Sequence, residues 1–96
     1  MSIYVHNLET RIDRIENIQK AALKLIEHRY SGFTSEGFVQ ASLSFLETNK
    51  DIYPDTYTRA VDIAQRMHQS ESIYSGIDAA SEIYGMIRGI AILNGK

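Results

Sequence analysis

Residues 73–93 read IYSGIDAASEIYGMIRGIAIL, and this stretch decides the fold of the 96-residue chain. Apolar side chains recur along it at alternating spacings of four and three, the heptad pattern of a helix that packs lengthwise on other helices. We therefore expect a C-terminal helix at the centre of a helical core, ended by Asn94-Gly95. The predicted inner positions of this helix are Ile73, Ile77, Ala80, Tyr84, Ile87 and Ala91.

A second face of the same segment carries small residues at every fourth position, namely Ser81, Gly85 and Gly89. Tyr74 and Ile92 lie on this side as well, away from the predicted inner stripe. A glycine inside a helix costs about 1 kcal/mol relative to alanine, and the usual compensation is the close approach of another backbone. The pattern predicts an interface with a second subunit or a partner. A neighbouring helix of the same chain, or surface glycines without a role, would also fit it.

Helical periodicity extends over most of the remaining chain. The first predicted helix, over residues 7–30, is about 36 Å long and should span the whole bundle. The second covers 34–49 and the third 54–68, where Pro54 suits a first helical turn. The fourth begins at residue 70 or 72. The residues expected to cap these helices are Asn7, Thr34 or Ser35, and Ser70 or Ser72.

Each of the three earlier segments has an apolar stripe on one side. Arg11 and Arg29 flank the stripe of the first helix and are expected at its rim, because arginine stems commonly cover apolar surface. The predicted inner residues are Leu8, Ile12, Ile15, Ala22 and Ile26 in the first helix, Phe38, Ala41, Ser42, Phe45 and Leu46 in the second, and Tyr57, Ala60, Val61, Ala64, Met67 and His68 in the third.

These patterns predict an all-α fold: a single domain over residues 1–96, built as an antiparallel bundle of about four helices. Neither an internal repeat nor a low-complexity or linker segment divides the sequence. The N-terminus lacks the basic and apolar regions of a signal peptide. The most apolar stretch of the chain, residues 83–93, is interrupted by Arg88 and is too short to cross a bilayer. We expect a cytoplasmic protein that does not enter the membrane.

Composition argues against several kinds of chemistry. The chain has 10 Lys and Arg against 12 Asp and Glu, a net charge of -2, and no Cys. Such a mixed charge disfavours nucleic-acid binding, and the lack of cysteine excludes thiolate metal sites and thiol catalysis. His6, His28 and His68 are isolated in sequence, and no phosphate-binding glycine loop or nucleophile motif is present. We therefore expect a protein that is not an enzyme, with neither a metal nor a cofactor.

Tyrosine is the residue type that stands out, with six in the chain. Tyr53 and Tyr57 bracket Pro54 at a predicted helix–helix corner, and Arg59 is near. Tyr and Arg are enriched at binding hot spots, so this corner is a candidate partner-binding site. The competing interpretation is that Tyr57 belongs to the core and that Tyr53 packs against it where the helix begins.

Together these features favour a small protein–protein interaction module that self-associates through its C-terminal helix. It would act by binding another, unidentified protein, as an adaptor, an inhibitor or an immunity-type regulator does. The alternative is a protein that binds or sequesters a small ligand or nucleotide, in a pocket between subunits lined by Tyr and Arg.

Overall fold

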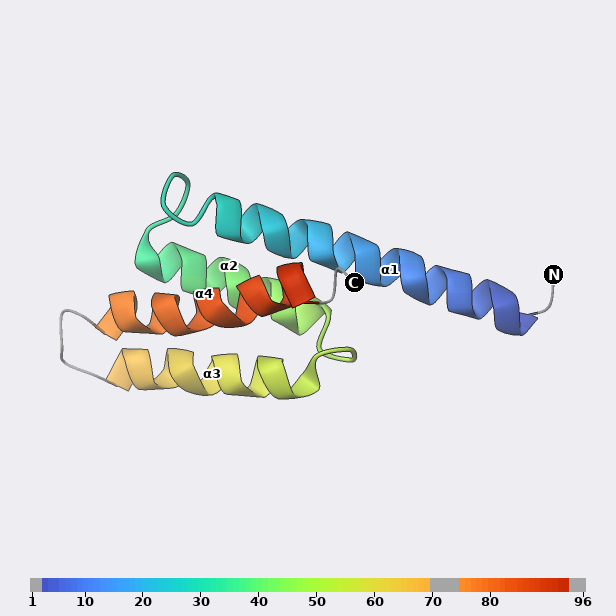
Figure 1. Ribbon diagram of the computed structural model, residues 1–96. Coiled ribbons are helices and arrows are strands. Elements are labelled where there is room, and N and C mark those ends of the chain that lie inside the picture. Colours follow the sequence, from blue (N-terminus) through green and yellow to red (C-terminus); the bar gives the residue numbers. More distant parts are fainter. Residues whose placement is uncertain (1–2, 70–74, 94–96) are drawn as a thin grey trace.

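The computed structural model describes residues 3–69 and 75–93, with side chains placed for 11–69 and 75–92. The described chain forms four helices that pack against one another without strands, which confirms the predicted all-α bundle (Figure 1). The helices are α1 (Ile3–Glu27), α2 (Ser35–Thr48), α3 (Pro54–Gln69) and α4 (Ser75–Leu93). Helices that follow one another in sequence run antiparallel (Figure 1).

Local sequence signals fix where α2 and α3 begin. The Thr34 hydroxyl accepts a hydrogen bond from the Gly37 N–H at 3.0 Å, so Thr34 is the predicted N-cap of α2. Pro54 is the first residue of α3, where its missing N–H is not needed. The limits of α1 differ from the prediction, because it starts at Ile3 rather than Asn7 and ends at Glu27. Asn7 is therefore not its N-cap.

Helix α4 lies at the centre of the bundle, as predicted. It contacts α1, α2 and α3, whereas α1 and α3 make no contact with each other among the described residues. Because α3 and α4 run antiparallel and pack against each other, the two are separate helices rather than one kinked helix (Figure 1). The C-terminal helix makes the most extensive contacts with the other helices, although α2 also contacts all three of its neighbours.

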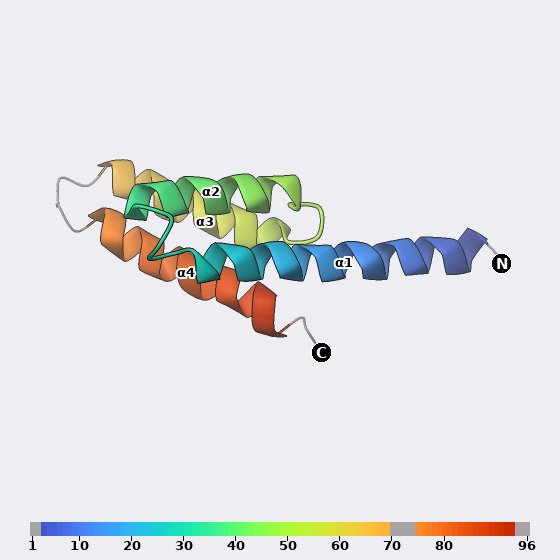
Figure 2. The same ribbon diagram turned by 90° about the horizontal axis from the view of Figure 1, so that it is seen from above.

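Helix α1 does not end where the bundle ends. Its 25 residues correspond to about 37 Å, and its N-terminal part extends beyond the other three helices (Figure 2). The molecule is accordingly elongated, with extents of 57 × 25 × 18 Å and a radius of gyration of 15.0 Å. The expectation that this helix would span the whole bundle was wrong, because α1 lies beside part of the bundle and projects beyond one end of it (Figure 2).

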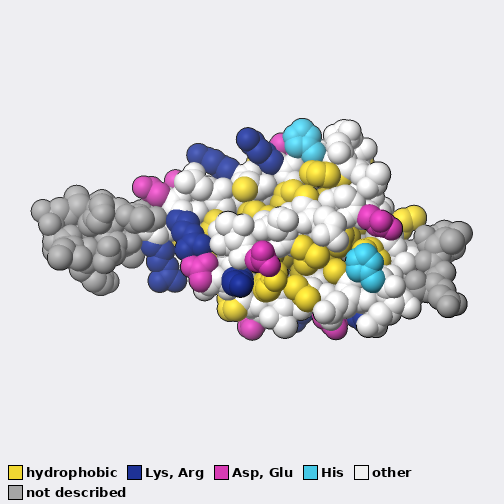
Figure 3. All heavy atoms as spheres, turned by 180° about the vertical axis from the view of Figure 1, so that it is seen from behind, with side chains coloured by type: hydrophobic (Ala, Val, Ile, Leu, Met, Phe, Trp, Pro, Cys, Tyr) yellow, Lys and Arg dark blue, Asp and Glu magenta, His cyan; other side chains and the backbone are white. Residues whose placement is uncertain are grey.

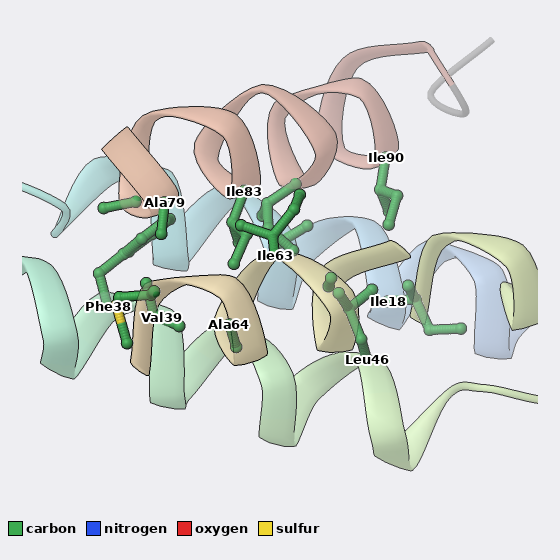
Figure 4. Close-up of a cluster of buried hydrophobic side chains, with 14 residues drawn as sticks. Ile18, Phe38, Val39, Leu46, Ile63, Ala64, Ala79, Ile83 and Ile90 are labelled. Carbon is green, nitrogen blue, oxygen red and sulfur yellow. The ribbon is translucent and has the colours of Figure 1, made fainter. Parts of the chain in front are cut away.

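The core lies where the four helices meet, and α1 contributes Ile18 and Ala22 to it. Phe38 and Leu46 from α2 and Ile83 and Ile87 from α4 are fully buried. The side chains of Phe38, Leu46 and Ile83 lie between the helices with those of Ile63 and Ala64 (Figure 4), and Ile87 belongs to the same buried cluster. Burial of such side chains is the main favourable term in folding.

The buried stripe of α4 matches the predicted one in part. Ala80 and Ile87 are buried as predicted, and Tyr84 and Ala91 are half-buried against the core. Ile83 and Ile90 are buried as well, whereas Ile77 is 51% exposed, and Ile73 lies outside the described residues. The predicted and the observed stripe have the same spacing of four and three residues. Because isoleucine occurs on several sides of α4, the periodicity of the sequence alone did not determine which side is buried.

Two further inner positions were wrong. Ile12 of α1 is about half exposed, and His68 of α3 is exposed at the surface. Leu8 lies outside the residues whose side chains are described. The misplaced positions of α1 and α4 leave apolar side chains on the surface.

Candidate interaction surface

The outer face of α4, made of Ser81, Gly85, Gly89 and Ile92, is called the α4 face below. Gly85 lies two residues, or about 200° of helix rotation, from the buried Ile83 and so faces away from the core. A Cβ atom built on Gly85 or Gly89 would meet no described atom within 4 Å. No described helix of this chain therefore packs against these glycines, which removes one of the three interpretations of the small-residue pattern.

Two other predicted interface residues also face away from the core. Ser81 is exposed and Ile92 is 49% exposed. Tyr74, the fifth predicted member, lies outside the described residues. The α4 face thus presents small side chains along its middle and an exposed isoleucine near its C-terminal end.

Arg59 joins this face rather than the tyrosine corner. A hollow of about 270 Å³ between α3 and α4 is lined by Arg59 together with Asp55, Thr56, Gly85, Met86 and Gly89. The absent glycine side chains help to open this hollow. The sequence could not place Arg59 there, because its position depends on how α3 packs on α4.

Tyr53 and Tyr57 are both half-buried and pack against the hydrophobic core. The Tyr57 hydroxyl donates a hydrogen bond to Glu47 Oε2 at 3.1 Å, and the Lys50 ammonium lies 5.8 Å from its ring centroid. The hydrogen bond to the Glu47 carboxylate is the main cause that raises the pKa of Tyr57. The structure therefore joins Tyr57 to α2 and does not bring the two tyrosines and Arg59 into one patch.

Exposed apolar side chains gather on α1, on α4 and on the turn after α1. The large exposed hydrophobic residues of the described chain are Ile12, Leu23, Tyr30, Ile77 and Ile92. Ile12 and Leu23 share one side of α1, since eleven residues correspond to about 20° of net rotation. Leu23 also lies about 200° from Ala21, which lines the α2 side of α1, so this stripe faces away from α2. The apolar surface is thus concentrated on the two helices that are in mutual contact.

Arg29 is a residue whose role the sequence did not reveal. It was expected at a rim, but it is only 6% exposed. Its guanidinium lies 4.6 Å from the Tyr30 ring centroid and 5.2 Å from that of Phe38, and Nη2 donates to Ser35 Oγ at 3.3 Å. Stacking on aromatic rings compensates in part for burying the charge. This cluster fastens the C-terminal end of α1 to the start of α2.

Arg14 fastens the other end of the α1–α2 pair. Its two terminal nitrogens donate to the Asp51 carboxylate at 2.6 and 2.7 Å, in a bidentate arrangement. These hydrogen bonds are the main cause that lowers the pKa of Asp51 below its ordinary 3.8 and raises the pKa of Arg14. The pair links α1 to the turn between α2 and α3.

We expect this pair to make stability depend on pH. Because the pKa of Asp51 is lower in the folded protein, the pair stabilises the fold above pH 3.8 and this contribution is lost as the pH falls through the lowered value. The difference in urea midpoint between the wild type and Asp51→Asn should be present at pH 7 and close in acid. Arg14→Gln should show the same profile. A difference that persists unchanged at low pH would contradict the assignment.

Other kinds of site find little support in the described part of the chain. It contains no group of three or more His, Cys, Asp or Glu side chains that could hold a metal ion. None of its helices is long and apolar enough to cross a membrane. His28 and His68 are exposed and lie on different helix ends.

Comparisons with protein-family models, with curated proteins and with solved structures found no match. The surfaces of the molecule are therefore what indicates its function. The most distinctive of them is the α4 face, with its two open glycines.

Proposed function

We propose that this protein is a small non-enzymatic interaction module that self-associates through the α4 face. The observation that carries the proposal is the open space at Gly85 and Gly89 in the middle of a helix. Each glycine costs the helix about 1 kcal/mol relative to alanine, and no described helix of the same chain compensates for it. A second backbone that approaches closely would supply the missing contact.

The surroundings of the glycines support an apolar contact. Ile77 and Ile92 are about half exposed near the two ends of α4, and burying them in an interface would be favourable. A two-fold symmetric pair would use this surface on both copies. In this proposal Ile12 and Leu23 of α1 remain beside the contact and offer apolar surface to a different protein, as an adaptor, inhibitor or immunity-type regulator requires.

The test is the molar mass in solution, measured by light scattering behind size exclusion. We expect at least twice the chain mass of 10.9 kDa for the wild type. Gly85→Gln with Gly89→Gln should shift the mass toward 10.9 kDa, because the longer side chains keep the backbones apart. Glutamine is a better helix former than glycine, so loss of assembly would not reflect loss of the helix.

The matched control is Ser44→Gln with Thr58→Gln, which places the same side chain at exposed positions of α2 and α3. This variant should assemble like the wild type. A wild-type protein that is monomeric at every concentration, or an assembly that the glycine substitutions leave unchanged, would overturn the proposal.

The second candidate function is binding of a small ligand or nucleotide between subunits. The observation that favours it is the position of Arg59 in the hollow beside Gly85 and Gly89, which a second subunit would cover. A ligand at 100 times its dissociation constant adds about 2.7 kcal/mol to stability, so a thermal-shift screen with nucleotides detects it. A shift that Arg59→Gln abolishes supports this function, and no shift with any nucleotide argues against it.

A further inference from the structure

A hollow between α1 and α2 is the largest open apolar feature among the cavities described. It has a volume of about 430 Å³, within the range of small-molecule sites. Ala21 and Leu25 of α1, Phe33 of the following turn and Phe45 of α2 form its apolar surface. These four side chains are half-buried, so their apolar surface is not fully covered by the fold. In the view from behind, hydrophobic side chains come to the surface along the body of the molecule (Figure 3).

The one charged side chain in the lining of this hollow is positive. It is the exposed Lys24 of α1. The exposed His28, which follows the end of α1, lines the hollow as well. Gly32 completes the lining, and no carboxylate is part of it. An occupant with an apolar body and a negative group would match both the surface and the charge.

We propose that this hollow, here named the α1–α2 hollow, binds a small apolar carboxylate. The hydrocarbon part would contact Leu25, Phe33 and Phe45, and the carboxylate would lie beside the Lys24 ammonium. Arginine is absent from the lining, so the charge contact is with a point-like ammonium rather than a bidentate guanidinium. The α1–α2 hollow shares no residue with the α4 face, so this site does not depend on self-association.

The experiment is a titration of the ¹⁵N-labelled full chain with decanoate, followed by amide chemical shifts. Two ligands of the same chain length, 1-decanol and decyltrimethylammonium, replace the negative group by a neutral and a positive one. We expect saturable shifts centred on Leu25, Phe33 and Phe45, with decanoate binding more tightly than decanol and decyltrimethylammonium most weakly.

Two lysine variants distinguish a direct contact between Lys24 and the carboxylate from a general electrostatic attraction between the protein and an anion. Lys24→Gln should weaken decanoate binding about two- to five-fold, the size of an exposed ion pair, and leave decanol binding unchanged. Lys20→Gln removes the same charge from an exposed position that does not line the hollow, and should have no effect. Ala21→Phe should fill the hollow and block all three ligands while the helical circular dichroism is retained.

The proposal fails if decanoate gives no saturable shifts at these amides, or if the shifts centre on α4 instead. It also fails if decyltrimethylammonium binds as tightly as decanoate, or if Lys20→Gln and Lys24→Gln weaken decanoate equally. Since the hollow and the α4 face are separate, a monomeric protein that binds decanoate would refute self-association and support this site.

Discussion

Replacing Phe38 by alanine is expected to lower the free energy of unfolding by about 3–5 kcal/mol, the usual cost of removing a fully buried aromatic side chain. Phe38 lies where α2 meets α4, and its ring centroid is 6.2 Å from that of Phe33 and 6.2 Å from that of Tyr84. It also covers the guanidinium of Arg29. The loss should appear as a lower midpoint in urea unfolding followed by circular dichroism.

The control for this change is Phe33→Ala, which removes the same side chain from a half-buried position and should cost clearly less. A loss of 3–5 kcal/mol is comparable to the whole stability of some small domains, about 5–15 kcal/mol. If Phe38→Ala does not fold, Phe38→Leu keeps most of the volume and gives a measurable midpoint. Equal losses at positions 33 and 38 would contradict the packing described.

Ile83→Ala is expected to cost about 2–5 kcal/mol, and Ile77→Ala less than about 0.5 kcal/mol. The two residues have the same side chain and belong to the same helix, but Ile83 is fully buried and Ile77 is 51% exposed. The comparison therefore measures which side of α4 faces the core (Figure 4).

The measurement is the free energy of unfolding of both variants, obtained by chemical denaturation at one low protein concentration. Dilution limits any contribution of self-association at Ile77 to this value. The reverse order of the two losses would mean that α4 is rotated relative to the structure described. Similar losses at both sites would mean that the helix is covered on both sides.

The number of helices and the starts of α2 and α3 could be predicted from sequence because they depend on local chemistry. Thr34 caps α2 through its own hydroxyl, and Pro54 lacks the N–H that an inner helical residue would need. The rotation of α4 could not be predicted, since isoleucines lie on several of its sides. The start of α1 was misjudged because Asn7 is a good cap that this helix does not use.

The candidate site was predictable only in part. The small residues of the α4 face lie on one helix, so their common side follows from helical spacing alone. Arg59 belongs to another helix, and its place beside Gly85 follows only from the packing of α3 on α4. The burial of Arg29 likewise depends on Phe38, which belongs to the next helix and reaches Arg29 only through the turn between α1 and α2.

The position of α4 has a consequence for how the chain folds. This helix follows the other three in sequence, and it packs against all of them. A nascent chain that ends before residue 75 therefore lacks Ile83, Ile87 and Ile90, and leaves the inner side chains of Phe38 and Leu46 without their main cover. Completion of the tertiary structure must then wait until α4 has been synthesised, and a product truncated before this helix would be a ready substrate for cellular proteases.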